Sequence, residues 1–287
     1  MNDLIASVFT GIITDENEQY YFVQKSGQTF RLKKEEGNHV LGEAVEGFGY
    51  LNQKQEAAFT TQIPKIRKGH YAFAPVTEVR RDLGVFVDIG LSDKDIAVSL
   101  DELPTMHNLW PKKEDRLMIA LRVDKKDRIW GTLAEDHHFQ SLKKMANEEM
   151  QNKDISGVVY RLKIAGSYIL TDDYHIGFIH PSERYTEPRL GQRVSGRVIG
   201  MRPDGIANVS LKPRAYEAIP EDAAMVYAYL KQRPNQEMAY TIKSSPEEIE
   251  RLFGISKARF KRALGNLLKQ RLIVQENGVT KLTKNSN

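Results

Sequence analysis

The chain has 287 residues, of which 40% are hydrophobic and 28% charged, a composition typical of a globular protein with about two ordinary domains. No run of about 18 apolar residues is present, which excludes a transmembrane helix, and the N-terminus lacks the pattern of a secretory signal. Cysteine is absent, which excludes disulfides and thiolate metal sites and favours a reducing, cytoplasmic location.

The net charge of +4 is distributed unevenly along the chain. Residues 1–68 and 69–152 carry −1 and −3, whereas residues 153–219 and 222–287 carry +3 and +6. A basic C-terminal half is a reason to look for a surface that binds a polyanion.

Most of the first 212 residues follow the pattern of short strands broken by Gly, Asp and Asn, which is typical of small β barrels or sandwiches. A Gly-x-x-Val-like segment recurs, with its apolar anchor at Val45, Leu117 and Val194, at intervals of 72 and 77 residues. The spacing predicts three similar units rather than one large sheet. We place these units at residues 1–66, 67–134 and 152–219.

Residues 135–151 interrupt the strand pattern. They contain no Gly or Pro, and Phe139, Leu142, Met145 and Ala146 follow helical spacing. We therefore expect a helix over 135–151 that links the second unit to the third.

Residues 220–287 have the pattern of a winged helix. Ser245 and Glu248 form a capping box at a helix start, and Ser256 caps a second helix with an apolar stripe. Asn277-Gly278 then predicts the turn of a hairpin. The expected fold is mainly β, with tandem small barrels followed by a C-terminal α/β winged helix.

Strand alternation predicts which side chains point outward from the barrels. Phe86 lies on the face opposite Val85 and Val87 in the second unit, and Tyr168, Phe178 and His180 form an outward patch in the third. Exposed rings near basic groups suit the stacking of nucleotide bases. The alternative is that each ring packs against a neighbouring domain and that His180 is an ordinary surface histidine.

The chain resembles tandem S1-type RNA-binding domains, which are five-stranded OB-fold barrels. In the third unit the resemblance lies in residues 166–168, 180–183, 191–194 and 210–212, and in the second unit in residues 84–90 and 101–103. The order of three such units and a winged helix resembles the bacterial conserved virulence factor B family. This resemblance implies five-stranded OB-fold (S1-like) barrels, of which the first is divergent.

The resemblance also implies RNA-contacting positions. The stacking aromatic of the second strand corresponds to Phe86 and Tyr168, while Leu83 and Ala165 replace the aromatic that often precedes the glycine. The histidine of the third strand corresponds to His180 and is replaced by Ser99 in the second unit.

The Asp and Arg of the hairpin between the fourth and fifth strands correspond to Asp124 and Arg128 in the second unit. In the third unit these places hold Arg202 and Ile206. The first unit offers aromatic residues at 20–22, but the sequence does not indicate which ring faces outward.

In the winged helix, Lys257, Arg259 and Arg262 are the candidates for contact with a phosphate backbone. The alternative is a solvated charged helix face. Since recognition helices enter the major groove of DNA, double-stranded DNA is a rival partner for this domain.

No catalytic or metal site is predicted. Adjacent histidines such as His137 and His138 point about 100° apart on a helix and lack metal-ligand spacing. No phosphate-binding glycine loop is present, so we expect no cofactor and no enzyme activity.

The hypothesis is therefore a cytoplasmic RNA-binding protein, favouring single-stranded RNA, for which the resemblance implies post-transcriptional regulation of gene expression. Two alternatives stay open: a DNA-binding regulator that uses the winged helix, and an interaction scaffold associated with the ribosome or a nuclease. RNA affinity is expected to be concentrated in residues 153–287, because phosphate neutralisation dominates affinity.

Overall fold

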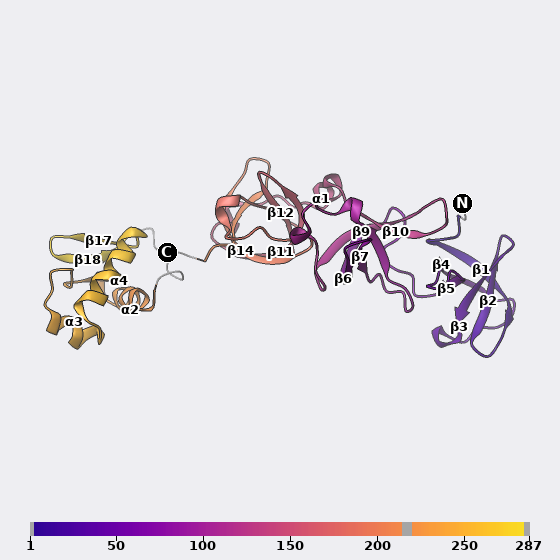
Figure 1. Cartoon of the computed structure of the whole chain (residues 1–287), viewed down its shortest axis with the longest axis horizontal. Helices are drawn as coiled ribbons and strands as arrows, with labels where there is room; N and C mark the ends of the chain where they lie inside the picture. The colour runs from indigo at the N-terminus through magenta and orange to yellow at the C-terminus, as the bar shows by residue number, and fades with distance from the viewer. Residues whose placement is uncertain (1–2, 214–219, 284–287) are drawn as a thin grey trace. The chain divides into compact units, whose positions relative to one another are not determined.

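The computed structural model describes residues 3–213 and 220–283. The chain divides into two compact units, Met1–Leu211 and Lys212–Asn287. The first unit holds three closed five-stranded barrels, and the second holds helices and a three-stranded sheet (Figure 1). The expected fold class, mainly β with five-stranded barrels and a C-terminal winged helix, is confirmed.

The three barrels share one topology. The first is β1 (Ser7–Glu16), β2 (Tyr20–Lys25), β3 (Gln28–Lys33), β4 (Ala44–Leu51) and β5 (Ala57–Thr60). The second is β6 (Ala72–Arg80), β7 (Gly84–Val87), β8 (Ile96–Ser99), β9 (Arg116–Val123) and β10 (Ile129–Leu133). The third is β11 (Asp154–Lys163), β12 (Gly166–Thr171), β13 (Ile176–Ile179), β14 (Arg193–Met201) and β15 (Ala207–Ser210). In each barrel the third and fifth strands pair in parallel, as in an OB fold.

Two local features bend the first strand and start the second. Each first strand carries a register shift, between Ile13 and Asp15, Val76 and Glu78, and Val159 and Arg161, and such a bulge bends a strand so that the sheet closes. The second strands of two barrels begin at Gly84 and Gly166, which have φ values of +134° and +149°. A Cβ at either position would clash with the backbone of the third strand, so only glycine fits.

A one-turn 3-10 helix follows the third strand of each barrel and contacts the end of the fifth: η1 (Lys34–Glu36), η2 (Leu100–Glu102) and η5 (Pro181–Glu183). The Glu36 carboxylate accepts the Thr61 amide at 2.8 Å, and the Glu102 carboxylate accepts the Leu133 amide at 2.7 Å. These hydrogen bonds attach the 3-10 helix to the end of the last strand of each of these two barrels. The other short turns are η3 (His107–Leu109), η4 (Glu148–Met150) and η6 (Pro234–Gln236).

The linker helix is shorter than expected. Helix α1 spans Asp136–Leu142 and buries Phe139, but the prediction of a helix over 135–151 is wrong beyond residue 142. After Leu142 the backbone amides form hydrogen bonds with loops of the third barrel. The Lys144 amide donates to Tyr174 O at 2.8 Å, and the Ala146 amide donates to Gly205 O at 3.1 Å. These bonds replace helical ones, and Met145 is left 60% exposed.

The second unit has the elements of a winged helix. These are α2 (Glu221–Lys231), β16 (Glu237–Met238), α3 (Pro246–Phe253), α4 (Lys257–Lys269), β17 (Ile273–Glu276) and β18 (Val279–Leu282). The predicted capping box is confirmed, because Ser245 Oγ accepts the Glu248 amide and Glu248 Oε2 accepts the Ser245 amide. Gly254 ends α3 in the left-handed conformation, at φ +63°. Stacked rings of Phe253 and Phe260, 5.0 Å apart, join α3 to α4 in the core.

Direct bonds connect the second and third barrels. Asp115 is 8% exposed and pairs with Arg189, whose Nε lies 3.1 Å from Oδ2. The Arg116 amide donates to Gly191 O at 2.9 Å, and a Cβ at Gly191 would come within 3.0 Å of Arg116 O. A backbone hydrogen bond and an ion pair therefore join the two barrels.

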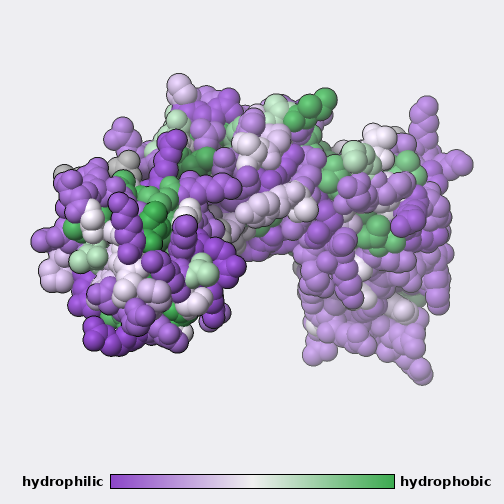
Figure 2. Space-filling view, turned by 60° about the vertical axis from the view of Figure 1, so that its left-hand side comes forward, coloured by the Kyte–Doolittle hydropathy of each residue, from purple (hydrophilic) through white to green (hydrophobic). Residues whose placement is uncertain are grey.

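In Figure 2 the visible face is mostly hydrophilic, with apolar residues in small separate patches. Among the residues described, no helix has the length and apolar character needed to cross a membrane.

Candidate nucleic-acid interface

In the third barrel, strand register brings Tyr168 and Phe178 side by side on the outer face. Tyr168 of β12 pairs with Arg161 of β11 and with Phe178 of β13, and Phe178 pairs with Asn208 of β15. The two half-buried rings have centroids 5.1 Å apart and are tilted by 57°. Their neighbours Ile169 and Ile179 are 1% and 0% exposed in the barrel core, which confirms the predicted alternation. We call the residues that pair across the strands in this way the outer row of a barrel.

Cations flank both rings. Lys163 Nζ lies 5.3 Å from the centroid of Tyr168, and the guanidinium carbon of Arg202 lies 5.3 Å from the centroid of Phe178. Arg202 also pairs with Asp204 at 3.4 Å. A ring pair edged by a lysine and an arginine provides stacking surface together with charge for phosphate. Lys163 was not among the residues predicted from the sequence.

His180 is exposed beyond Phe178, with ring centroids 6.4 Å apart. Its Nδ1 accepts the Ser182 amide at 3.2 Å and lies 2.8 Å from Ser182 Oγ. The histidine therefore caps η5, and its ring edge remains part of the predicted patch.

Tyr160, rather than Tyr168, packs directly against α1. The rings of Phe139 and Tyr160 stack with centroids 3.8 Å apart, whereas Tyr168 lies 6.2 Å from Tyr160, at the margin of this cluster. Leu170 and the neighbouring Ile176 are fully covered there. Helix α1 thus covers one part of the outer face, and Tyr168 lies at the edge of the covered part. The position of Tyr168 is therefore intermediate between an outward ring and a ring packed against a neighbouring element, the two alternatives that the sequence left open.

In the second barrel the outer row reads Glu78, Phe86, Ala97, Trp130 and Arg122, by strand register. Phe86 lies on the outer face, as predicted, and is half-buried, and the Arg80 guanidinium lies 6.0 Å from its ring centroid. Trp130 was not among the residues predicted from the sequence, and the third barrel has Asn208 at the equivalent position.

Asp124 and Arg128 lie in one hairpin beside Trp130. The Asp124 carboxylate accepts the Arg128 Nε at 2.7 Å and the Trp130 Nε1 at 3.2 Å, together with the amides of Lys126 and Arg128. Desolvation acts to raise the pKa of Asp124, but these hydrogen bonds outweigh it and hold the pKa well below its ordinary value. The aspartate therefore stays ionised and orients both Arg128 and Trp130.

The same hairpin recurs in the third barrel. The Asp124 amide donates to Arg128 O at 3.0 Å, and the Arg202 amide donates to Ile206 O at 2.8 Å. The resemblance therefore aligned these positions correctly. Ile206 is buried, so the third barrel has no counterpart of the Arg128 side chain at this point.

In the first barrel Tyr20 and Phe22 share the outer face, where they pair with Lys33 and Arg31 of β3, whereas Tyr21 is 5% exposed in the core. Arg31 pairs with Glu56 at 2.7 Å. At the end of the row, Tyr50 is buried and its hydroxyl donates to Asp93 of the second barrel at 2.8 Å. In the first barrel, therefore, one end of the outer row is covered by the second barrel, and the charge of Arg31 is neutralised by Glu56.

In the winged helix the three predicted basic residues of α4 have different surroundings. Arg259 is exposed but bound to Asp222 of α2, with Nε 2.8 Å from Oδ2, and this hydrogen bond lowers the pKa of Asp222. Lys257 is half-buried, and Arg262 and the neighbouring Lys261 are exposed. Arg259 therefore joins two helices, and Lys261 adds an exposed cation that the sequence reading omitted.

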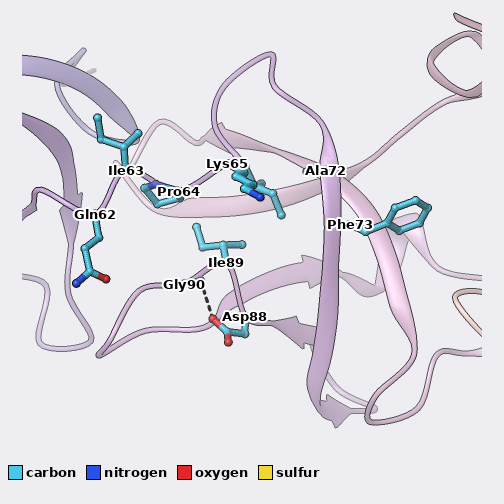
Figure 3. Close-up of a pocket in the computed structure, with 10 residues that line it drawn as sticks. Gln62, Ile63, Pro64, Lys65, Ala72, Phe73, Asp88, Ile89 and Gly90 are labelled. Atoms are coloured by element: carbon cyan, nitrogen blue, oxygen red, sulfur yellow. Dashed lines mark hydrogen bonds between the residues drawn. The ribbon is translucent and has the colours of Figure 1, made fainter. Parts of the chain in front are cut away.

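A pocket of about 390 Å³ lies where the first two barrels meet, lined by residues that include Pro64, Lys65, Phe73 and Ile89 (Figure 3). The Phe73 ring points away from the other labelled side chains. Asp88, at the same place, accepts the Gly90 amide at 2.7 Å and so stabilises the turn after β7. The guanidinium carbon of Arg116 lies 5.5 Å from the centroid of the Phe73 ring, but this ring does not point toward the other labelled side chains.

Family models match four consecutive parts of the chain. Residues 7–62 match an S1 domain, 71–132 the CvfB first S1-like domain, 139–213 the second domain of virulence regulatory factor CvfB, and 224–282 a CvfB-like winged helix domain.

Similar proteins match over almost the full length. The uncharacterized protein YitL of Bacillus subtilis is 42% identical, over 91% of this chain and 87% of its own. A solved structure of a multidomain protein with nucleic acid binding domains from Streptococcus pneumoniae is 50% identical, with a TM-score of 0.73, over 99% of this chain and 100% of that one. Conserved virulence factor B of Staphylococcus epidermidis is 34% identical, over 98% of this chain and 96% of its own. With barrels, winged helix and full-length identity in agreement, the chain belongs to the conserved virulence factor B family.

Proposed function

We propose that this chain binds single-stranded RNA, without catalysis, and acts in the cytoplasm in post-transcriptional regulation of gene expression. The observation that carries the proposal is the pair of outer-face rings, Tyr168 and Phe178, with Lys163 and Arg202 beside them. Rings take up bases and cations neutralise phosphates, and together these are the two components of single-strand binding.

The preference for a single strand follows from the shape of this surface. The rings lie on the strands of a barrel, where a base must be unpaired to stack on them. The solved relative from Streptococcus pneumoniae, described as having nucleic acid binding domains, supports the nucleic acid as ligand. The matching family description, a virulence regulatory factor, supports a regulatory role.

Duplex DNA is a second candidate partner, for the winged helix alone. The exposed Lys261 and Arg262 lie on α4, the helix that occupies the place of a recognition helix. Binding at this site would depend on the phosphate backbone, because the exposed residues are cations.

A titration of the full-length chain with a single-stranded RNA and with a duplex DNA of the same sequence separates the candidates. Tighter binding to the RNA supports the proposed function. Tighter binding to the duplex supports the DNA-binding alternative, and binding to neither supports a scaffold that contacts protein.

A further inference from the structure

The second barrel has a gap in its outer row that the other two barrels fill. Ala97 of β8 lies between Phe86 of β7 and Trp130 of β10, and it pairs in register with both. At the equivalent position the third barrel has Phe178, between Tyr168 and Asn208. The first barrel has Arg31 there. Only in the second barrel, therefore, is a methyl group flanked by one large ring on each side.

The dimensions of the gap suit one flat ring. Neighbouring strands lie about 4.8 Å apart, so two strands separated by a third are about 10 Å apart. Aromatic rings pair with centroids about 4.5–7 Å apart, and the gap therefore accommodates one further ring between Phe86 and Trp130. Ala97 is only half-buried, although it is small and lies in the middle of a strand. Within residues 3–213 and 220–283, no aromatic ring packs against Phe86 or Trp130.

Cations lie beside both rings of the gap, and each is in an ion pair: Arg80 with Asp82 at 3.4 Å, Arg122 with Glu102 at 3.6 Å and Arg128 with Asp124 at 2.7 Å. The guanidinium carbons of Arg122 and Arg128 lie 5.7 and 5.5 Å from the centroid of Trp130, and Arg80 lies 6.0 Å from that of Phe86. Each ring therefore has a cation beside it. The hydrogen bond from Trp130 Nε1 to the Asp124 carboxylate fixes the indole, so the gap exists before a ligand arrives.

From this geometry we infer that the second barrel holds one unpaired base of an RNA strand between Phe86 and Trp130, with Ala97 as the floor. The inference rests on the proposed function and adds a base-binding site that includes Trp130 and Ala97. It also gives the second barrel a role that does not follow from its net charge. The third barrel, whose rings adjoin each other, offers a stacking surface instead of a slot.

Two variants test the slot through affinity for a single-stranded RNA of about 30 nucleotides, which exceeds the site of one barrel. Ala97→Leu fills the gap and should lower the affinity about fivefold or more, as expected when one stacked base is lost. Ala97→Ser keeps the gap open and should bind as the wild type does. Ala44→Leu adds the same side chain to an exposed strand position of the first barrel and is the matched control. Melting temperatures of all three show that they fold.

The indole supplies a direct readout. The chain has two tryptophans, and Trp110 is 5% exposed, so Trp130 is the one within reach of a base. RNA should quench the fluorescence of the wild type, and Trp130→Phe, which keeps a ring at the site, should abolish this quenching while it still binds. If the wild type binds RNA with unchanged fluorescence, or Ala97→Leu binds as tightly as the wild type, the slot is overturned and the proposed function stands. If the wild type binds no RNA, both are overturned.

Discussion

At the scale of single residues, Tyr168 is the most direct test of the outer-face surface. Its ring lies against Phe178 and beside Lys163, at the margin of the cluster that α1 covers. Tyr168→Ala should weaken RNA binding by about 1–3 kcal/mol, the range for one stacking surface. Because the ring is half-buried, the free energy of unfolding should fall by less than the ~3–5 kcal/mol of a buried ring.

Titration with RNA and thermal unfolding are to be measured on the same sample of Tyr168→Ala. Tyr168→Phe keeps the ring and should retain the affinity of the wild type. A large loss of stability with unchanged affinity per folded molecule would contradict a role of Tyr168 in binding and assign it to the core.

The pair of Asp222 and Arg259 makes the winged helix sensitive to acid. The Arg259 guanidinium, by its hydrogen bond and charge, lowers the pKa of Asp222 in the folded chain below the ordinary value of about 3.9. The folded state therefore gains stability from this group at pH values above about 4, and loses it as the pH falls through the lower folded pKa. Asp222→Asn should lower the melting temperature of the second unit at pH 7.

The difference between Asp222→Asn and the wild type should then shrink as the pH falls below about 4, because the wild-type carboxylate becomes protonated at acid pH. Glu276→Gln, at the exposed end of the hairpin, is the matched control and should follow the wild type at each pH. A difference that stays constant from pH 7 to pH 2 would show that the ion pair contributes no pH-dependent stability.

At the scale of elements, α1 packs on the third barrel beside the proposed binding surface. Phe139 is 2% exposed and stacks on Tyr160 of β11. Phe139→Ala should therefore lower the free energy of unfolding by about 3–5 kcal/mol, the usual loss for a buried aromatic ring. RNA affinity per folded molecule should change little, in contrast to Tyr168→Ala. Denaturant unfolding and RNA titration measure both quantities, and a loss of affinity with intact stability would place α1 in the binding site.

The elements show which features were readable from the sequence. Alternation placed Phe86, Tyr168 and Phe178 correctly on the outer face, because the side-chain period of a strand is fixed at two. Caps such as Ser245 and the Asn277-Gly278 turn were also readable, because they satisfy local geometry. The register between strands is a long-range property, and for this reason Trp130 and Phe22 were found only in the structure.

The same distinction explains one prediction that the structure overturned and one ion pair that the sequence did not indicate. The helix over 135–151 was expected from local spacing, but residues beyond Leu142 bond to loops that lie about 30 to 60 residues further along the chain. Arg259 was assigned to phosphate from its place on α4, and its partner Asp222 lies on another helix, 37 residues away. Neither partner is visible in a local pattern.

At the scale of the whole molecule, basic charge is concentrated in the second unit. Residues 212–287 hold 14 Lys and Arg against 8 Asp and Glu, whereas residues 1–211 hold 28 against 30. The first unit holds the outer rows with their rings, and the second unit holds the excess of basic residues. A division at residue 152 would separate the buried Asp115 from Arg189, so a division between the two units, after Leu211, is the cleaner one.

The fragment of residues 1–211 should bind single-stranded RNA more weakly than the full chain, and with a smaller dependence on salt. Each phosphate contact contributes about 0.7 to the slope of log affinity against log salt for a single strand. Removing the basic unit should lower that slope, while stacking on Tyr168, which releases no counterions, is retained.

In the full chain, Lys261→Gln combined with Arg262→Gln should lower the slope by about 1.4, if both exposed cations contact phosphate. Salt titrations of the three proteins with one RNA measure these slopes. Equal slopes for the fragment and the full chain would show that the phosphate contacts lie within the barrels, on cations such as Lys163 and Arg202, and that the winged helix binds something other than this strand.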